Sequence, residues 1–97
     1  MIYELHPAAE AELTSAALYY AREANRSIAL AFLAEFERVS ELVEGNQQLG
    51  TKSKVGLRVY RFRRFPYSIV YRESQAGPYI YAVAHQRRDP GYWLSRV

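Results

Sequence analysis

The spacing of apolar residues changes once along the chain, and this change limits the folds open to it. Before residue 45 apolar side chains recur every three or four positions, whereas after residue 56 they alternate with every second position. The first spacing is typical of helices with one buried face, and the second of half-buried strands. The sequence therefore predicts a helical first half followed by a sheet, which is an α+β arrangement.

Two helices are predicted, over 7–25 and 27–44. The apolar stripe of the first comprises Ala9, Leu13, Ala16, Ala17, Tyr20 and Ala24. Pro7 suits a first helical turn, and the helix dipole favours Glu10 and Glu12 near that end. The stripe of the second comprises Ala29, Phe32, Phe36, Val39 and Val43, with Glu35, Arg38, Glu41 and Glu44 expected on the opposite side. A connection of about two residues should make the pair an antiparallel hairpin.

Three strands are predicted after a glycine-rich loop over 45–56. They cover 57–63, 67–72 and 79–85, and their short connections favour antiparallel pairing. A further short strand, Ile2 to His6, is expected in the same sheet. The expected fold is a single α+β domain over 1–97, in which about four antiparallel strands pack against an N-terminal helix hairpin. The element order is βααβββ, followed by a polar C-terminal tail.

Charge is divided unevenly between the two halves. Residues 1–50 contain three arginines and eight glutamates, for a net charge of −5, whereas residues 51–97 contain ten basic and two acidic residues, for a net charge of +8. A basic half of this kind favours nucleic acid or an acidic protein as partner, and charge alone does not choose between them.

Several classes of protein are disfavoured by what the sequence lacks. It has no cysteine, which excludes disulfides and thiolate metal sites, and we expect neither a metal nor another cofactor. No window approaches the roughly 18 apolar residues of a membrane span, and the N-terminus does not resemble a signal peptide. We therefore expect a cytoplasmic protein without a membrane partner.

Three motifs resemble the RelE/ParE superfamily of bacterial toxins. PAAEAEL at 7–13 follows the opening strand, FPYSIVYR at 65–72 is similar to the hairpin signature of the family, and VAHQRRDPGYW at 83–93 is similar to its closing motif. Together they span almost the whole chain and favour the ParE-like branch.

The resemblance implies the toxin of a type II toxin–antitoxin pair, held inactive by an acidic antitoxin of the ParD or RelB kind. Operator DNA would then be contacted only through the antitoxin. ParE-like toxins inhibit DNA gyrase by binding, whereas RelE-like toxins cleave messenger RNA on the ribosome. Gyrase inhibition is the first hypothesis, ribosome-dependent cleavage is the second, and a binding module of the same fold without toxicity is the third.

Residues for target or antitoxin binding are expected among basic and aromatic positions of the second half. They are Arg58, Arg61, Arg63, Arg64, Tyr79, Tyr81, Arg87, Arg88 and Trp93. Strand alternation places Tyr79 and Tyr81 on one face with His85. A metal-free ribonuclease would instead need cations and groups that move protons, and the candidates are Arg61, His85, Arg87 and Tyr92.

Residues of the closing motif also have structural interpretations. His85 can bond within the fold, and Asp89 before Pro90 is typical of a turn. An Arg–Asp pair can tie the tail to the hairpin, and Trp93 can pack the tail onto the domain.

Overall fold

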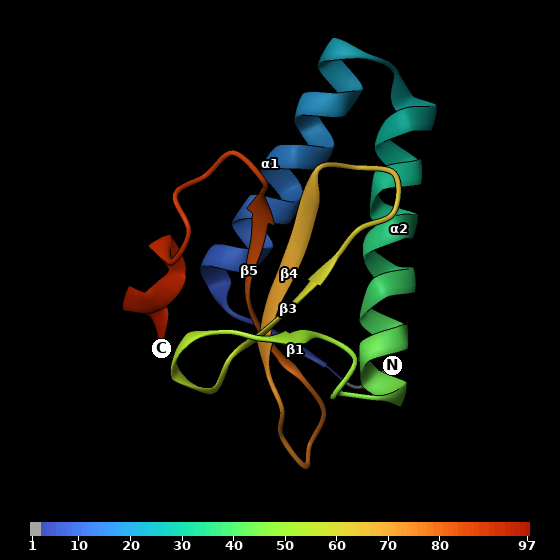
Figure 1. Cartoon of the computed structure of the whole chain (residues 1–97). Coiled ribbons are helices and arrows are strands. Elements are labelled where there is room, and N and C mark those ends of the chain that lie inside the picture. Colours follow the sequence, from blue (N-terminus) through green and yellow to red (C-terminus); the bar gives the residue numbers. More distant parts are fainter. Residues whose placement is uncertain (1–2) are drawn as a thin grey trace.

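The computed structural model describes residues 3–97 and has the predicted α+β fold (Figure 1). The elements are β1 (Glu4–Leu5), α1 (Pro7–Glu23), α2 (Arg26–Gly45), β2 (Thr51–Lys52), η1 (Lys54–Gly56), β3 (Arg58–Arg61), β4 (Tyr67–Arg72), β5 (Tyr79–His85) and η2 (Tyr92–Arg96). Ile2, which the sequence assigns to the first strand, lies outside the described residues. Both helices and the three later strands occur where the apolar spacing predicts them.

The sheet has five strands in the order β1-β5-β4-β3-β2. Four of them pair antiparallel, but β1 pairs with β5 in parallel, through Glu4 with Tyr79 and Leu5 with Ile80. The sheet is therefore mixed rather than fully antiparallel. The strand that was not predicted, β2, lies inside the 45–56 segment, which was expected to be a loop. Its two residues pair with Val59 and Arg58 at the edge of the sheet.

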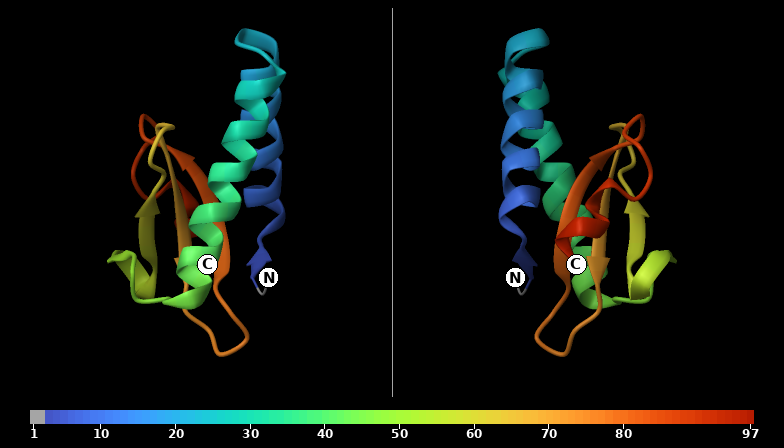
Figure 2. Two further views of the ribbon diagram at one scale, coloured as in Figure 1. Left: turned by 90° about the vertical axis from the view of Figure 1, so that its right-hand side faces the viewer. Right: turned by 90° about the vertical axis from the view of Figure 1, so that its left-hand side faces the viewer.

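Each helix of the hairpin begins directly after a residue whose side chain caps it. The His6 side chain accepts a hydrogen bond of 3.0 Å from Ala8 N at the start of α1, and Asn25 accepts one of 2.9 Å from Ile28 N at the start of α2. The two helices cover one face of the sheet and extend beyond its upper end (Figure 2). Among residues 3–97, neither helix combines the length and apolar character needed to cross a membrane.

The main core lies between the hairpin and the sheet. The stripe of α2 meets residues of the sheet there: Phe32, Phe36, Val39 and Val43 lie with Ile69, Tyr71, Ile80 and Val83. At the upper end the ring of Phe32 lies 5.1–5.6 Å from those of Tyr20, Phe62, Phe65 and Tyr67. The contacts with Phe65 and Tyr67 are edge to face, those with Tyr20 and Phe62 are tilted, and rings at such distances bury large apolar areas.

Glu35 corrects one expectation about α2. It was placed on the solvent side, but it is only 8% exposed. Its carboxylate accepts two hydrogen bonds of 2.8 Å from Arg38 and a further one from Arg63 N. These bonds lower the pKa of Glu35 because they favour the charged form. Glu35 therefore joins α2 to the end of β3.

A β-bulge in β5 changes which residues share a face. Val70 pairs with Ala82 whereas Tyr71 pairs with Ile80, so Tyr81 is an extra residue on β5. Ile80 consequently faces the hairpin, and Tyr81 packs on the opposite face of the sheet. His85 packs against Tyr67 of the main core, with ring centroids 5.0 Å apart. The expectation that Tyr81 and His85 share a face is therefore wrong, because alternation breaks at the bulge.

The opposite face of the sheet has a smaller core of its own. Leu57, Val70, Ala82 and Ala84 are buried there. Tyr92 and Trp93 of η2 pack against them, so the tail (residues 86–97) covers part of this face (Figure 2). This face of the sheet is therefore closed over the area beneath η2.

Candidate functional site

Glu12 on α1 holds the tail in place. Its carboxylate accepts hydrogen bonds from Val83 N at 3.0 Å, from the Tyr92 hydroxyl at 2.6 Å, and from both terminal nitrogens of Arg96 at 2.9 Å. Arg96 also donates to the carbonyl of Tyr81 at 2.9 Å. One carboxylate thus connects α1, β5 and η2, and a two-pronged Arg–carboxylate pair of this kind is strong.

These contacts shift the pKa values of the groups involved. Burial alone would raise the pKa of Glu12, but the hydrogen bonds from Arg96, Tyr92 and Val83 outweigh burial and hold it below its ordinary value. Burial and the bond to Glu12 raise the pKa of Tyr92 far above that of an ordinary tyrosine. Tyr92 is therefore a protonated donor to Glu12 at physiological pH and a poor general base.

The turn that leads into η2 presents two arginines. Gly91 has a φ of 88°, a left-handed conformation that favours glycine, and it lets the chain reverse after Pro90. Arg87 is exposed, and its backbone N–H donates to Nδ1 of His85 at 3.0 Å. The Arg88 guanidinium lies 3.8 Å from the centre of the Tyr92 ring and 3.9 Å from Glu12. Arg88 thus joins the tail to the hairpin through Glu12, whereas the sequence suggested a pair with Asp89.

Trp93 packs on the smaller core, as the structural interpretation of this residue suggested. Its ring lies edge-on to Tyr92, with centroids 5.3 Å apart. Nε1 of Trp93 is buried and has no hydrogen-bond acceptor among the described residues. Trp93 therefore acts here through its apolar area rather than through its N–H group.

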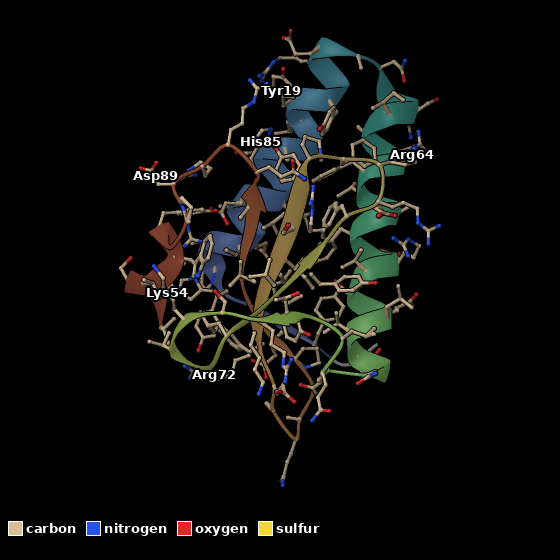
Figure 3. All side chains as sticks on the ribbon, in the orientation of Figure 1. Tyr19, Lys54, Arg64, Arg72, His85 and Asp89 are labelled. Carbon is tan, nitrogen blue, oxygen red and sulfur yellow. The ribbon has the colours of Figure 1, made fainter. Side chains whose placement is uncertain are left out.

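The arginines of β3 and its turn have two different roles. Arg58 is largely buried and makes internal contacts, a 3.0 Å bond to Glu73 and a 2.8 Å bond to the carbonyl of Gly50. Arg61, Arg63 and Arg64 are exposed, and we refer to these three as the arginine turn. In Figure 3, Arg64 lies beside α2, on the other side of the molecule from Asp89. The arginine turn and the tail are thus two separate basic regions.

Tyr79 and Tyr81 form an aromatic group on the face opposite the hairpin. Their ring centroids are 4.7 Å apart, and His6 lies 6.5 Å from the first and 6.1 Å from the second. The Arg72 guanidinium lies 5.6 Å from the Tyr81 ring. Both tyrosines are half-buried, so they combine packing with an accessible edge.

The four residues named for a ribonuclease do not converge. Arg61 pairs with Ser68 of β4, which in turn pairs with Ala84 of β5, so Arg61 lies two strands away from β5. His85 and Arg87 are neighbours, but Nδ1 of His85 already accepts the backbone N–H of Arg87. Tyr92 donates to Glu12.

Glu12 is the residue that sequence reasoning missed. It was interpreted only as a partner of the helix dipole. A signal was present, since Glu12 lies three residues after Ala9 and four before Ala16, and both alanines are buried. A charged residue between two buried positions of a helix stripe needs an internal partner.

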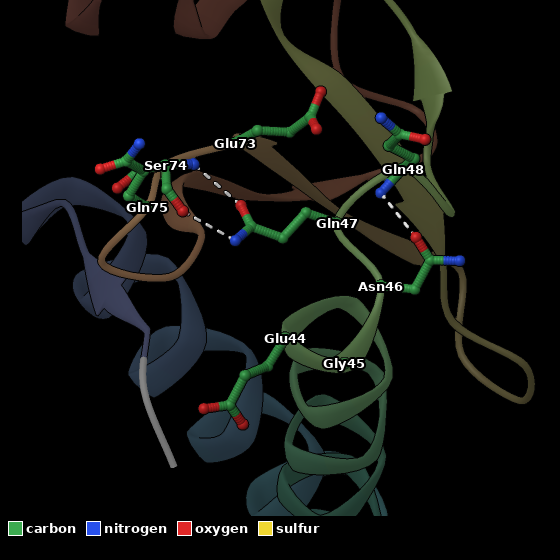
Figure 4. A pocket seen from close by; sticks show the side chains of 8 residues that line it. All are labelled: Glu44, Gly45, Asn46, Gln47, Gln48, Glu73, Ser74 and Gln75. Carbon is green, nitrogen blue, oxygen red and sulfur yellow. Dashed lines mark hydrogen bonds between the residues drawn. The ribbon is translucent and has the colours of Figure 1, made fainter.

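A polar hollow of about 550 Å³ lies where α2 ends beside the β4–β5 connection (Figure 4). The Gln47 side chain donates to the carbonyl of Ser74 at 2.8 Å and accepts from its N–H at 2.9 Å. Glu73 at its edge pairs with Arg58. These contacts fix the connection between β4 and β5 to the end of the hairpin.

Comparisons with known proteins identify the family through a family model and the fold through a solved structure. A family model described as the ParE toxin of the ParDE type II toxin–antitoxin system matches residues 3–90. Among solved structures, a chain of the chromosomal ParDE system from P. aeruginosa superposes with a TM-score of 0.75, covering 88% of this chain and 95% of that chain at 22% identity, which shows a common fold. No curated protein matches the chain in sequence. Because the family model covers most of its length, the chain belongs to the ParE toxin family of type II toxin–antitoxin systems.

Proposed function

We propose that this ParE-family toxin inhibits DNA gyrase by binding and that an acidic cognate antitoxin neutralises it. The observation that carries the proposal is that Tyr92 and His85, the two side chains that could transfer protons, are both held in hydrogen bonds within the fold. The Tyr92 hydroxyl donates to Glu12 and its pKa is raised, and Nδ1 of His85 accepts an internal hydrogen bond. A chain built this way is better suited to binding a target than to cutting RNA.

The exposed basic residues supply the binding surface in this proposal. Five arginines of the basic second half are exposed, Arg61, Arg63 and Arg64 in the arginine turn and Arg87 and Arg88 in the tail. Such charges attract an acidic protein and speed its association. The antitoxin would meet these residues, and operator DNA would be contacted through the antitoxin alone.

Two assays of the purified chain, run side by side, test the proposed target. Gyrase supercoiling and cell-free translation are measured with increasing amounts of toxin, with relaxation by a type I topoisomerase as the control for a general effect on DNA. We expect loss of supercoiling, unchanged translation and unchanged relaxation. Addition of the antitoxin encoded beside the toxin should restore supercoiling.

Two other outcomes would replace the proposal. Cleaved messenger RNA with full gyrase activity would identify the chain as a ribosome-dependent ribonuclease. Full activity in both assays, together with a stable antitoxin complex, would identify a binding module of the same fold that is not toxic.

A further inference from the structure

Two hollows lie on either side of the start of the tail. The helix-side hollow has a volume of about 270 Å³, and its walls include Ser15, Ala16, Tyr19 and Tyr67. The sheet-side hollow has a volume of about 130 Å³, and its walls include Val59, Val70, Ala84, Pro90 and Trp93. His85 and Arg88 line both hollows. These two residues therefore form a ridge between two partly apolar depressions.

The ridge can donate hydrogen bonds to an anion. Nδ1 of His85 accepts the Arg87 N–H, so the proton of the neutral ring is on Nε2, which makes that nitrogen a donor. The Arg88 side chain is 55% exposed, and stacking on Tyr92 fixes the direction of its guanidinium. The two donors lie at the two ends of one turn, which the Arg88 N–H closes onto the His85 carbonyl at 3.1 Å, and both line the same pair of hollows.

Glu12 offsets only part of the positive charge around this ridge. Its carboxylate lies 2.9 Å from Arg96, which balances its charge, whereas Arg88 is 3.9 Å away. The three positive charges of Arg87, Arg88 and Arg96 exceed the two negative charges of Glu12 and Asp89, which leaves an excess of positive charge. A single additional carboxylate would complete the balance.

The walls of the hollows indicate what surrounds that carboxylate. Tyr19 is 51% exposed although it is a large aromatic side chain, and it stands at the helix-side hollow with Ala16 and Tyr67. In Figure 3, Tyr19 and His85 lie near each other at the upper end of the sheet. The sheet-side hollow is bounded by valines and by the Trp93 ring. Both hollows are suited to apolar side chains.

We propose that the ridge of His85 and Arg88 binds the carboxylate of one acidic residue in the antitoxin, and that apolar side chains on either side of that residue occupy the two hollows. The proposal rests on the antitoxin function proposed above and names the recognition element for that partner. A nucleic-acid backbone fits less well. It carries a charged phosphate at every step and has no apolar side chains, whereas the ridge lies between two partly apolar hollows.

Binding of the cognate antitoxin to variants of the full chain tests this inference. Arg88→Gln removes the positive charge while keeping a polar side chain, His85→Phe removes the ring N–H donor while keeping an aromatic ring, and Ser15→Phe fills the helix-side hollow from an exposed position of α1. We expect each substitution to raise the dissociation constant of the complex by about tenfold or more. Lys52→Gln, which removes one charge from β2, is the matched control and should stay within about twofold.

A double-mutant cycle identifies the acidic residue of the partner. Each Asp and Glu of the antitoxin is replaced by Ala and combined with Arg88→Gln, and thermal unfolding checks that every variant is folded. One acidic residue should show non-additive losses with Arg88→Gln. Additive losses at every acidic residue would overturn the inference, as would a folded Ser15→Phe variant that binds like the parent.

Three further results would also overturn it, in distinguishable ways. If the parent and the ridge variants bind the antitoxin equally and are neutralised equally, the role proposed for the ridge is wrong but the proposed neutralisation by an antitoxin stands. If the parent forms no complex with the antitoxin, both proposals fail. Weakened binding of a single-stranded RNA oligonucleotide by Arg88→Gln, with unchanged antitoxin binding, would assign the ridge to nucleic acid instead.

Discussion

Glu12 and Arg96 are separated by 84 residues in the sequence and are joined by two hydrogen bonds of 2.9 Å. This pair makes the tail a part of the fold rather than an appendage. Because Glu12 also receives the Tyr92 hydroxyl and the Val83 N–H, loss of its charge should affect three elements at once.

Replacing Glu12 by Gln should destabilise the protein, by about 3 kcal/mol at neutral pH, because Arg96 and Tyr92 lose a charged acceptor in a largely buried place. The folded-state pKa of Glu12 is lowered, so its contribution is fully present above the ordinary value of 4.5 and is lost as pH falls through the lower folded-state value. Urea unfolding of both proteins should therefore give a difference that shrinks below that pH. Glu35 has a lowered pKa as well, but it is present in both proteins and cancels.

A difference that stays constant, or that grows in acid, would contradict the role assigned to Glu12. Glu10→Gln is the matched control, since Glu10 is exposed on the same helix. It should change the free energy of unfolding by less than about 0.5 kcal/mol.

Trp93→Ala should lower stability by about 2 kcal/mol, because it removes a half-buried ring from the smaller core. Trp93→Phe keeps most of that area and removes the buried Nε1 donor that has no acceptor among the described residues. We expect it to stay within about 1 kcal/mol of the parent in thermal or urea unfolding. An equal loss of stability in both variants would show that the Trp93 N–H group has a hydrogen-bond partner and that packing of the ring is not the main contribution of Trp93.

Arg58→Ala and Arg61→Ala should behave differently although they lie on the same strand. The first removes the contacts to Glu73 and to the carbonyls of Gly50 and Gln48, and we expect a loss of about 1 to 2 kcal/mol. The second removes an exposed charge and should be nearly neutral for folding. Urea denaturation curves compare them directly, and similar curves would mean that the contacts of Arg58 contribute little.

Replacing Arg61, Arg63 and Arg64 together by Ala should leave the fold intact and slow association with the antitoxin by about tenfold at low salt. The bond between Arg63 N and Glu35 involves the backbone and is retained. Stopped-flow association at increasing salt should show the difference shrinking as screening increases. Arg22→Ala, which removes an exposed charge from the last turn of α1, serves as control. A difference in association rate between the triple variant and the parent that does not depend on salt would indicate misfolding instead.

Much of the fold follows from local patterns in the sequence. The α2 stripe of Phe32, Phe36, Val39 and Val43 is buried as its spacing predicts, and β4 and β5 cover the predicted ranges. The helix was predictable because it buries one face, and the two strands because they are short runs rich in β-branched and aromatic residues, although both of their faces are buried. The strand β2 was not, since its two residues, Thr51 and Lys52, are exposed and acquire their pairing only from β3.

The arrangement around the tail depends on contacts distant in sequence. The basic and aromatic residues of the closing motif were visible, but their partner Glu12 lies on the first helix. The bulge at Tyr81 also left no signal, because a strand with one extra residue still alternates on either side of it. Which face each of Tyr79, Tyr81 and His85 occupies thus depends on pairing between strands, and the periodicity of one strand cannot reveal it.

The parallel pairing of β1 with β5 has a consequence for the order of events during synthesis. The first strand to leave the ribosome joins the sheet only after residues 79–85 have emerged, and Glu12 obtains its partners only after residues 92–96. Helices can form early, whereas contacts between distant segments close late. The nascent chain therefore lacks its finished fold until residues 92–96 have emerged, so the first strand and the tail are fixed in place in a late step.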